Sequence, residues 1–224
     1  GLAGVPVCAE TVAISTALQL AGETGARLHF ARLSSAAGVA LVRQARQQGA
    51  KVSCDVAVHH LHLSEVDIGY FDSHARFDPP LRSGADRAAL RKAVSEGLAA
   101  VCSDHSPVDE DGKQLPFAEA VPGATGLELL LPLTLKLAEE MKIPLVTALA
   151  RVTCDPAAVL GIDAGTLAVG KPADICVFEA HEPWRVLPEA LRSQGKNTPF
   201  IGYEMAGRVS ATLVGGRLVF ARQG

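Results

Sequence analysis

The sequence predicts an α/β protein with a parallel sheet, followed by a smaller β-rich segment. Short apolar runs alternate with helical patterns at the spacing of β–α units. One run, at the start of residues 97–107, is nearly continuous, as is typical of a parallel strand buried on both faces. After about residue 161 the pattern changes to short β-prone runs separated by glycine turns. We therefore expect two regions, residues 1–160 and 161–224.

The first half of the chain predicts alternating helices and strands. Apolar residues recur at intervals of three and four over residues 9–23, which predicts a helix that ends at Gly25. Ser34 or Ser35 can cap the second helix. The further expected elements are a strand within residues 26–33, a helix over 38–48, a strand over 51–58, a helix over 86–96 and a strand within 97–107.

Prolines and glycines divide the remaining segments. Residues 74–82 should hold a strand end and a turn, because Asp-Pro-Pro stops a helix and does not fit a central strand. A long helical region is expected from about residue 127 to 160, with breaks near Pro132 and Pro144. The run TLVGGRLVF predicts a hairpin that turns at Gly215-Gly216.

The composition excludes several classes of protein. The net charge is −3 and no block of lysine or arginine stands out, which argues against binding to nucleic acid or an anionic membrane. No apolar run approaches the roughly 20 residues that span a bilayer. The N-terminus does not have the pattern of a signal peptide. The five cysteines are scattered singly, so we expect reduced thiols in a cytoplasmic protein, without disulfides or a zinc knuckle.

Polar side chains cluster where three predicted parallel strands end. These clusters are His29 to Ser35, His59-His60 and Asp104-His105. Active sites of parallel α/β proteins form at this edge. Taken alone, each cluster has an ordinary structural explanation: a histidine at a strand end is more often structural, and Asp104 could cap a helix as readily as act as a base. His60 and His62 should point away from the ligand face, because neighbouring strand residues point in opposite directions.

The order and spacing of four motifs resemble the dihydroorotase branch of the cyclic amidohydrolases. The motifs are SCDVAVHHLHL, FDPPLR, SDHSP and PGATGLE. The C-terminal run from GTLAVGKPADICVFE to VSATLVGGRLV also resembles the last segment of that superfamily. The resemblance covers almost the whole chain and rests on a specific combination of motifs.

This resemblance implies a (β/α)8 barrel whose strand ends hold one or two zinc ions. It also implies an aspartate that shuttles a proton while the ring of a cyclic amide is opened or closed. His59 would be a metal ligand, and Asp104 a ligand and the proton shuttle. The chain would supply only the later half of the barrel, together with a strand segment that completes a small β-sandwich. We expect the other half in a removed N-terminal segment or another subunit, because a half-barrel of four strands leaves open sheet edges.

Three family positions are altered. Members of the family usually read His-x-x-His-x-Ser-Thr after the first strand, and the second histidine binds metal; this chain has His29-Phe-Ala-Arg32. An arginine stays protonated and has no lone pair to donate, although it could pair with Asp104. The family asparagine that contacts the substrate is Asp78 here, which would repel an anionic substrate. The histidine that contacts the substrate carboxylate is Val108.

These changes favour a catalytically inactive dihydroorotase-like subunit of pyrimidine biosynthesis, with vestigial His59 and Asp104 and with no cofactor expected. The resemblance implies the aspartate transcarbamoylase catalytic chain as its partner. Two alternatives stay open. One is an active zinc-dependent dihydroorotase that interconverts carbamoyl aspartate and dihydroorotate. The other is a different amidohydrolase with a mononuclear site built on the same two residues.

Overall fold

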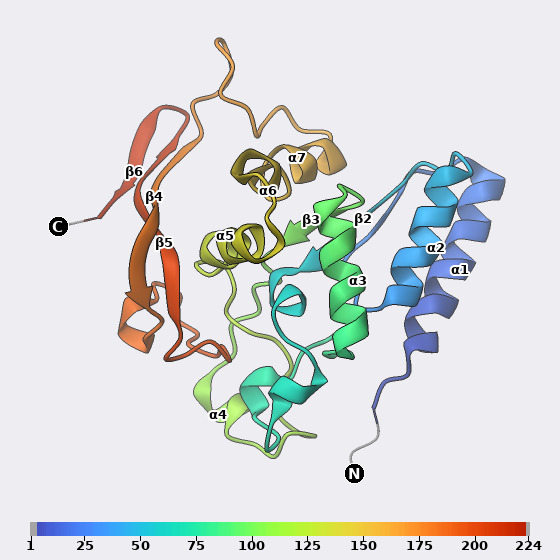
Figure 1. Cartoon of the computed structure of the whole chain (residues 1–224), viewed down its shortest axis with the longest axis horizontal. Helices are drawn as coiled ribbons and strands as arrows, with labels where there is room; N and C mark the ends of the chain where they lie inside the picture. The colour runs from blue at the N-terminus through green and yellow to red at the C-terminus, as the bar shows by residue number, and fades with distance from the viewer. Residues whose placement is uncertain (1–3, 223–224) are drawn as a thin grey trace.

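The computed structural model describes residues 4–222 and contains two separate three-stranded sheets. The parallel sheet consists of β1 (Leu28–Phe30), β2 (Val52–Ala57) and β3 (Ala99–Cys102), in the order β1-β2-β3. The antiparallel sheet consists of β4 (Ile175–Arg185), β5 (Glu204–Val214) and β6 (Arg217–Ala221), in the order β4-β5-β6. Figure 1 shows the antiparallel sheet at one side of the molecule and the parallel sheet near its middle, with α5 between them.

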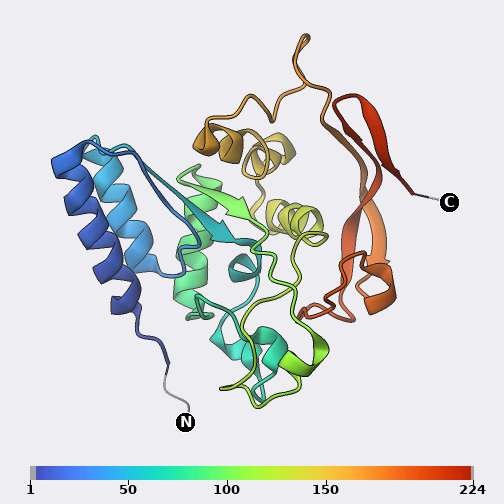
Figure 2. The ribbon, with the colours of Figure 1, turned by 180° about the vertical axis from the view of Figure 1, so that it is seen from behind.

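Helices α1, α2 and α3 form a row beside the parallel sheet, and both views show it (Figures 1 and 2). Their bounds are Val7–Thr24, Ala36–Gln47 and Gly84–Ser95. Helix α2 begins where Ser35 accepts a hydrogen bond from the Gly38 amide. Between the two sheets lie the helices α5 (Leu130–Met141), α6 (Leu145–Ala150) and α7 (Cys154–Leu160).

The loops that follow β2 and β3 carry short helical turns. After β2 come η1 (Val58–Leu61), η2 (Glu65–Ile68) and η3 (Ser73–Ala75), and after β3 comes α4 (Glu110–Lys113). A further turn, η4 (Pro188–Ala190), follows β4. The segments around η2, η3 and α4 lie side by side at the bottom of Figure 1. They extend from the carboxyl-terminal edge of the parallel sheet, which is the edge where the polar clusters of the sequence lie.

The apolar core lies between the parallel sheet and its helices. Its fully buried members include Val42 of α2, Val56 of β2 and Leu90 of α3, and it continues to Leu133 of α5. This burial explains why β2 and β3 read as apolar runs: both of their faces are covered. No helix within residues 4–222 has the length and apolar character needed to cross a bilayer.

The structure corrects three details of the sequence prediction. Pro132 does not break a helix; it lies in the first turn of α5, where the missing N–H would have no intrahelical partner. Residues 74–82 contain no strand, because the chain there forms the turn η3 and a loop. The described part of the parallel sheet has three strands and not four. The helix break near Pro144 is confirmed, between α5 and α6.

The C-terminal hairpin is confirmed, with Gly215 and Gly216 joining β5 to β6 at φ values of 55° and 79°. The second sheet packs against α5 through Gly207, at φ 99°, where a Cβ atom would lie 2.4 Å from Leu135 Cδ1. Trp184 Nε1–H donates to the Gly207 carbonyl at 3.1 Å. Within the described residues these strands form a single antiparallel sheet, and the sandwich expected from the sequence stays a prediction.

Candidate functional site

The ends of the three parallel strands bring a small polar cluster together. Arg32 follows β1, His59 lies in the turn η1 after β2, and Asp104 follows β3. Arg32 Nη1 lies 3.2 Å from Asp104 Oδ1, and His59 Nε2 lies 3.7 Å from Asp104 Oδ2. Because parallel strands present their carboxyl ends at one edge, residues more than 70 positions apart meet there.

Arg32 forms the charged centre of this cluster. Its Nη1 donates both to Asp104 and, at 2.8 Å, to the Asp78 carbonyl. Arg32 and Asp104 have φ values of 59° and 43°, a left-handed conformation that costs a non-glycine residue about 1 kcal/mol or more. The surrounding structure therefore holds both backbones in positions that make the ion pair possible.

The acid–base state of Asp104 follows from its neighbours. Its side chain is 10% exposed, and this burial by itself would raise the pKa of the carboxyl. The adjacent His59 ring and the Arg32 guanidinium outweigh burial and hold the pKa of Asp104 below its usual range. Asp104 is therefore an anion that a cation of the protein itself already contacts.

His59 is almost completely buried and has one unsatisfied nitrogen. Its side chain is 1% exposed, and its ring stacks on Phe77 with centroids 4.7 Å apart. Its Nε2 is buried without a hydrogen-bond partner. Gly126 makes room for the ring, since a Cβ there would lie 3.1 Å from His59 Cε1 and 2.2 Å from the Ser103 carbonyl. The unsatisfied nitrogen points toward Asp104, where a ligand or a proton would satisfy it.

His29 of β1 hydrogen-bonds to two side chains of the neighbouring strand β2. Its Nε2 meets Asp55 Oδ2 at 2.7 Å and its Nδ1 meets Ser53 Oγ at 2.9 Å. The other oxygen of Asp55 accepts from the Arg32 backbone N–H at 2.8 Å and from Cys102 Sγ at 3.2 Å. Both ring nitrogens of His29 are thus occupied. Asp55, which the sequence analysis did not single out, orients the backbone of Arg32.

The described part of the polar cluster offers two of the three or more protein ligands that a zinc site takes. Structural and catalytic zinc sites take at least three protein ligands from nitrogen, sulfur or oxygen donors. Here His59 and Asp104 are the two candidates, and the guanidinium of Arg32 contacts the carboxylate that would bind the metal. Within residues 4–222 no group of three His, Cys, Asp or Glu side chains is arranged to hold a metal ion.

Asp78 and Val108, which the sequence analysis compared with substrate contacts of the family, each make a backbone hydrogen bond. The carbonyl of Asp78 accepts the hydrogen bond from Arg32. Val108 donates its backbone N–H to Asn197 Oδ1 at 2.9 Å. His105 Nδ1 accepts from the Gly126 and Leu127 amides at 3.2 and 3.3 Å, which ties the loop after β3 to the glycine loop.

Asn197 is a buried hub that the sequence analysis missed. Its Oδ1 also accepts from Thr125 Oγ1, and its Nδ2 donates to the carbonyls of Ser106 and Gly123. A single side chain thus holds the segment from the C-terminal region against the loops after β3. Asn197 begins the run NTPF, which lies within the C-terminal segment that resembles the superfamily, and nothing else in the sequence points to this residue.

Two glutamates that the sequence analysis did not assign also fix loops at this edge. Glu128 accepts from the Arg192 and Ser193 amides at 2.6 and 2.9 Å. Glu10 of α1 accepts from the backbone and hydroxyl groups of Ser34 and Ser35, at the N-terminus of α2. Both glutamates are occupied by these loop contacts, so we assign them to the scaffold.

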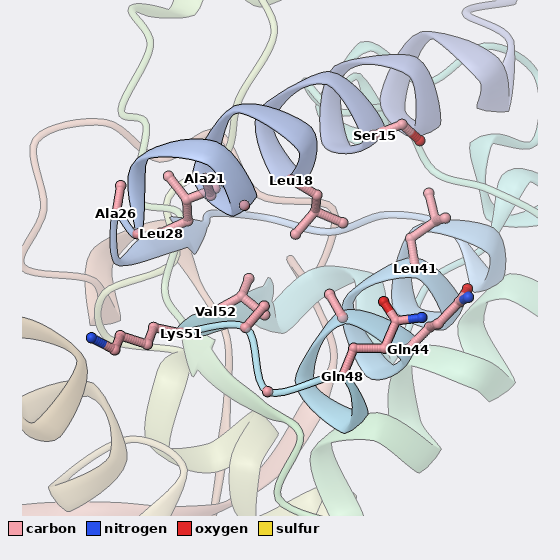
Figure 3. A pocket seen from close by; sticks show the side chains of 15 residues that line it. Ser15, Leu18, Ala21, Ala26, Leu28, Leu41, Gln44, Gln48, Lys51 and Val52 are labelled. Atoms are coloured by element: carbon pink, nitrogen blue, oxygen red, sulfur yellow. The ribbon is translucent and has the colours of Figure 1, made fainter.

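A recess of about 550 Å³ lies between α1 and α2, away from the polar cluster. Figure 3 shows Leu18, Leu28, Leu41 and Val52 around it, with Gln44 on α2. It opens near the amino-terminal ends of β1 and β2, and its lining carries no group of acidic, histidine or cysteine side chains. The polar cluster and this recess therefore lie at opposite edges of the parallel sheet: the cluster at the carboxyl-terminal ends of the strands, and the recess at the amino-terminal ends of β1 and β2.

The sequence matches known proteins over nearly its whole length. It is 45% identical over 219 residues to a dihydroorotase-like protein of Pseudomonas aeruginosa PAO1, covering 97% of this chain and 52% of that protein. It is 38% identical over 221 residues to a dihydroorotase of Geobacter sp. strain M21, covering 98% and 52%. The chain thus spans about half the length of the curated relatives it matches.

The fold matches solved structures to the same extent. L-Hydantoinase (dihydropyrimidinase) from Arthrobacter aurescens superposes with a TM-score of 0.89 at 30% identity, over 96% of this chain and 49% of that one. The model of the amidohydrolase family matches residues 8–219. Together with the parallel sheet and the polar cluster at its edge, this match shows that the chain belongs to the amidohydrolase family.

Proposed function

We propose that this chain is the later half of a dihydroorotase-like barrel, followed by a small β-sandwich segment. We further propose that it is catalytically inactive. Its role would be to serve pyrimidine biosynthesis in the cytoplasm as a structural partner of aspartate transcarbamoylase. The contact of Arg32 with Asp104 is the observation that carries the proposal. A permanent cation lies against the one carboxylate that would otherwise bind metal and move a proton. The division at about residue 160 into a barrel half and a β segment is part of the proposal.

Electrostatics supports inactivity. Two unit charges about 4 Å apart interact by about 4 kcal/mol at an effective dielectric of 20, and a divalent ion roughly doubles that repulsion. Arg32 cannot relieve it by losing its proton, because a guanidinium stays charged. The side chain is 43% exposed, so screening by water reduces the penalty without removing it.

The altered substrate positions support the same conclusion. Dihydroorotate and carbamoyl aspartate are anions, and the positions that contact them in the family hold an acid and an apolar side chain here, Asp78 and Val108. Neither can donate a hydrogen bond from its side chain to a carboxylate at neutral pH. The scaffold residues around them, such as Asn197, are nonetheless fully hydrogen-bonded.

The names of the relatives support a dihydroorotase-like chain, and they are also compatible with a second candidate function. One is called dihydroorotase-like and another dihydroorotase. The second candidate function is an active zinc-dependent dihydroorotase. The observation in its favour is the unsatisfied Nε2 of His59 beside Asp104, which would suit a metal ligand. In that case the remaining ligands come from outside the described residues.

Assembly with the transcarbamoylase tests the partner role. The protein and the transcarbamoylase catalytic chain of the same organism are mixed at micromolar concentration and separated by size exclusion. We expect one larger complex, with transcarbamoylase activity that depends on it. Clean separation of the two proteins, with transcarbamoylase activity unchanged, would reject this role.

Restoring the lost side chains tests the second candidate. We expect the double variant Arg32→His, Val108→His to show no dihydroorotate hydrolysis in the absence of the other barrel half. The matched control is Arg46→His on α2, where the arginine donates to the Leu98 carbonyl just before β3, at the amino-terminal edge of the sheet and away from the polar cluster. Substantial turnover by the double variant alone would count against a purely structural scaffold.

A further inference from the structure

Two loops at the carboxyl-terminal edge of the sheet form an exposed aromatic surface. The first, residues 65–75, follows β2, and the second, residues 109–119, follows β3. Tyr70 is fully exposed, Val66 is 78% exposed, and Phe71 and Leu115 are about half-exposed. We call these two loops the loop pair. Tyr70, Phe71 and Leu115 line one recess, and exposed apolar side chains that gather in this way are a mark of interaction sites.

Hydrogen bonds and an aromatic contact tie the two loops of the loop pair to each other. Lys113 Nζ donates to the Ser73 carbonyl at 3.0 Å, and Ser73 Oγ donates to the Lys113 carbonyl, so each loop holds the other. The rings of Phe71 and Phe117 meet edge to face with centroids 5.9 Å apart. Between the loops lies an open recess of about 800 Å³, lined by residues 70–74 and 113–118. A surface that is ordered before binding loses less entropy when a partner docks.

The backbone of the first loop is strained where it carries the exposed aromatic residues. Phe71 has φ 62°, a left-handed conformation that a residue with a side chain seldom adopts. Gly69, two residues earlier, has φ 56°. This double turn projects Tyr70 away from the protein. Strain held next to a fully exposed ring is characteristic of a functional loop.

The charge of the loop pair shows what kind of partner fits it. The two loops contain seven carboxylates and one lysine, a net charge of −6, while the whole chain has only −3. The rest of the chain is therefore net positive. All seven carboxylates are exposed, and they are Glu65, Asp67, Asp72, Asp109, Glu110, Asp111 and Glu119. Loops that expose acidic and apolar side chains together complement a protein surface that combines basic and apolar side chains.

We infer that the loop pair is the docking surface for a protein partner whose contact face combines apolar and basic side chains. The inference rests on the proposed function, under which this partner is the transcarbamoylase catalytic chain. Exposed aromatic residues serve as the anchors of such interfaces, and the surrounding charges set the speed and the salt dependence of association. Because the loops extend from the edge that holds Arg32, docking there would cover the former site.

Binding kinetics test the inference with two variants that leave the core intact. The first variant, Val66→Ser with Tyr70→Ser, removes two exposed apolar side chains, and its matched control is Leu167→Ser with Val169→Ser, on the exposed segment after α7. The second variant replaces Asp109, Glu110 and Asp111 by their amides, with Glu139→Gln on α5 as its control. Biolayer interferometry against the purified transcarbamoylase chain is run at 50 and 300 mM NaCl.

We expect the apolar variant to weaken binding about 30-fold, mainly through faster dissociation, as loss of an interface anchor does. The amide variant should slow association about tenfold at low salt and little at high salt. Both controls should bind like the wild type. Wild-type affinity in both variants would overturn the inference while leaving the proposed function standing. No binding by the wild type would overturn both. Self-association of the wild type that the apolar variant abolishes would assign the surface to a second copy and reject the inference.

Discussion

Replacing His62 by glutamine should flatten the acid side of this protein's stability curve. His62 lies at the end of the turn η1 and is only partly exposed, and its Nε2–H donates to the Leu133 carbonyl at 2.9 Å. Burial lowers the pKa of His62 to about 4, and the hydrogen bond to Leu133 offsets only part of that effect. An unfolded histidine has a pKa of about 6.5.

The sign and size of the effect follow from these two pKa values. Between pH 6.5 and 4 the unfolded chain binds a proton that the folded chain does not, so stability falls as the pH falls through this window. From pH 7 to pH 5 the difference amounts to about 2 kcal/mol for this one histidine. Below pH 4 both states are protonated, and His62 adds no further loss.

Urea unfolding, followed by circular dichroism at several pH values, measures this contribution. We expect the wild type to lose about 2 kcal/mol more than His62→Gln between pH 7 and pH 5, because every other titrating group is common to both proteins. The exposed His181, replaced by glutamine, is the control and should keep the wild-type slope. Parallel stability curves for the wild type and His62→Gln would refute the argument from burial.

Three further substitutions test the scaffold around the polar cluster, each by the urea midpoint at pH 7. Glu10→Ala should cost about 3 kcal/mol, since it leaves the donors of Ser34 and Ser35 without their carboxylate; the exposed Glu23→Ala should cost little. Asn197→Ala should lower the free energy of unfolding by about 3 kcal/mol, because it leaves buried hydrogen-bonding partners unpaired. An unchanged urea midpoint would show that Asn197 does not hold these loops together. Gly126→Ala should cost about 2 kcal/mol, because its Cβ would lie 2.2 Å from the Ser103 carbonyl; wild-type stability would contradict the close packing on His59.

Local features of the fold could be predicted because neighbouring residues determine them. Ser35 caps α2 because its hydroxyl reaches the Gly38 amide three residues on. The hairpin at Gly215-Gly216 follows from two consecutive residues that accept positive φ. The meeting of Arg32 and Asp104 could also be anticipated, since both follow parallel strands that end at one edge.

Long-range contacts outside the strand ends could not be predicted in this way. Asn197 binds Ser106 and Val108 from about 90 positions away, and no periodicity in either segment indicates that they meet. Proline interrupts the interior of a helix but is tolerated in the first turn, and the sequence around Pro132 does not show which of the two positions it occupies. The strand expected within residues 74–82 failed for a similar reason, because the apolar residues there fill the core from a loop, as Phe77 does beneath His59.

The most direct test of the central claim, that Arg32 replaces the metal as the partner of Asp104, is a zinc measurement. Zinc is determined by elemental analysis on protein purified without chelator, and dihydroorotate hydrolysis is assayed on the same sample, with a relative that carries histidine at the Arg32 position as the positive control. The account predicts zinc far below one ion per chain and no turnover. About one zinc per chain together with turnover would contradict it, and would mean that His59 and Asp104 hold a working metal site despite the guanidinium beside them.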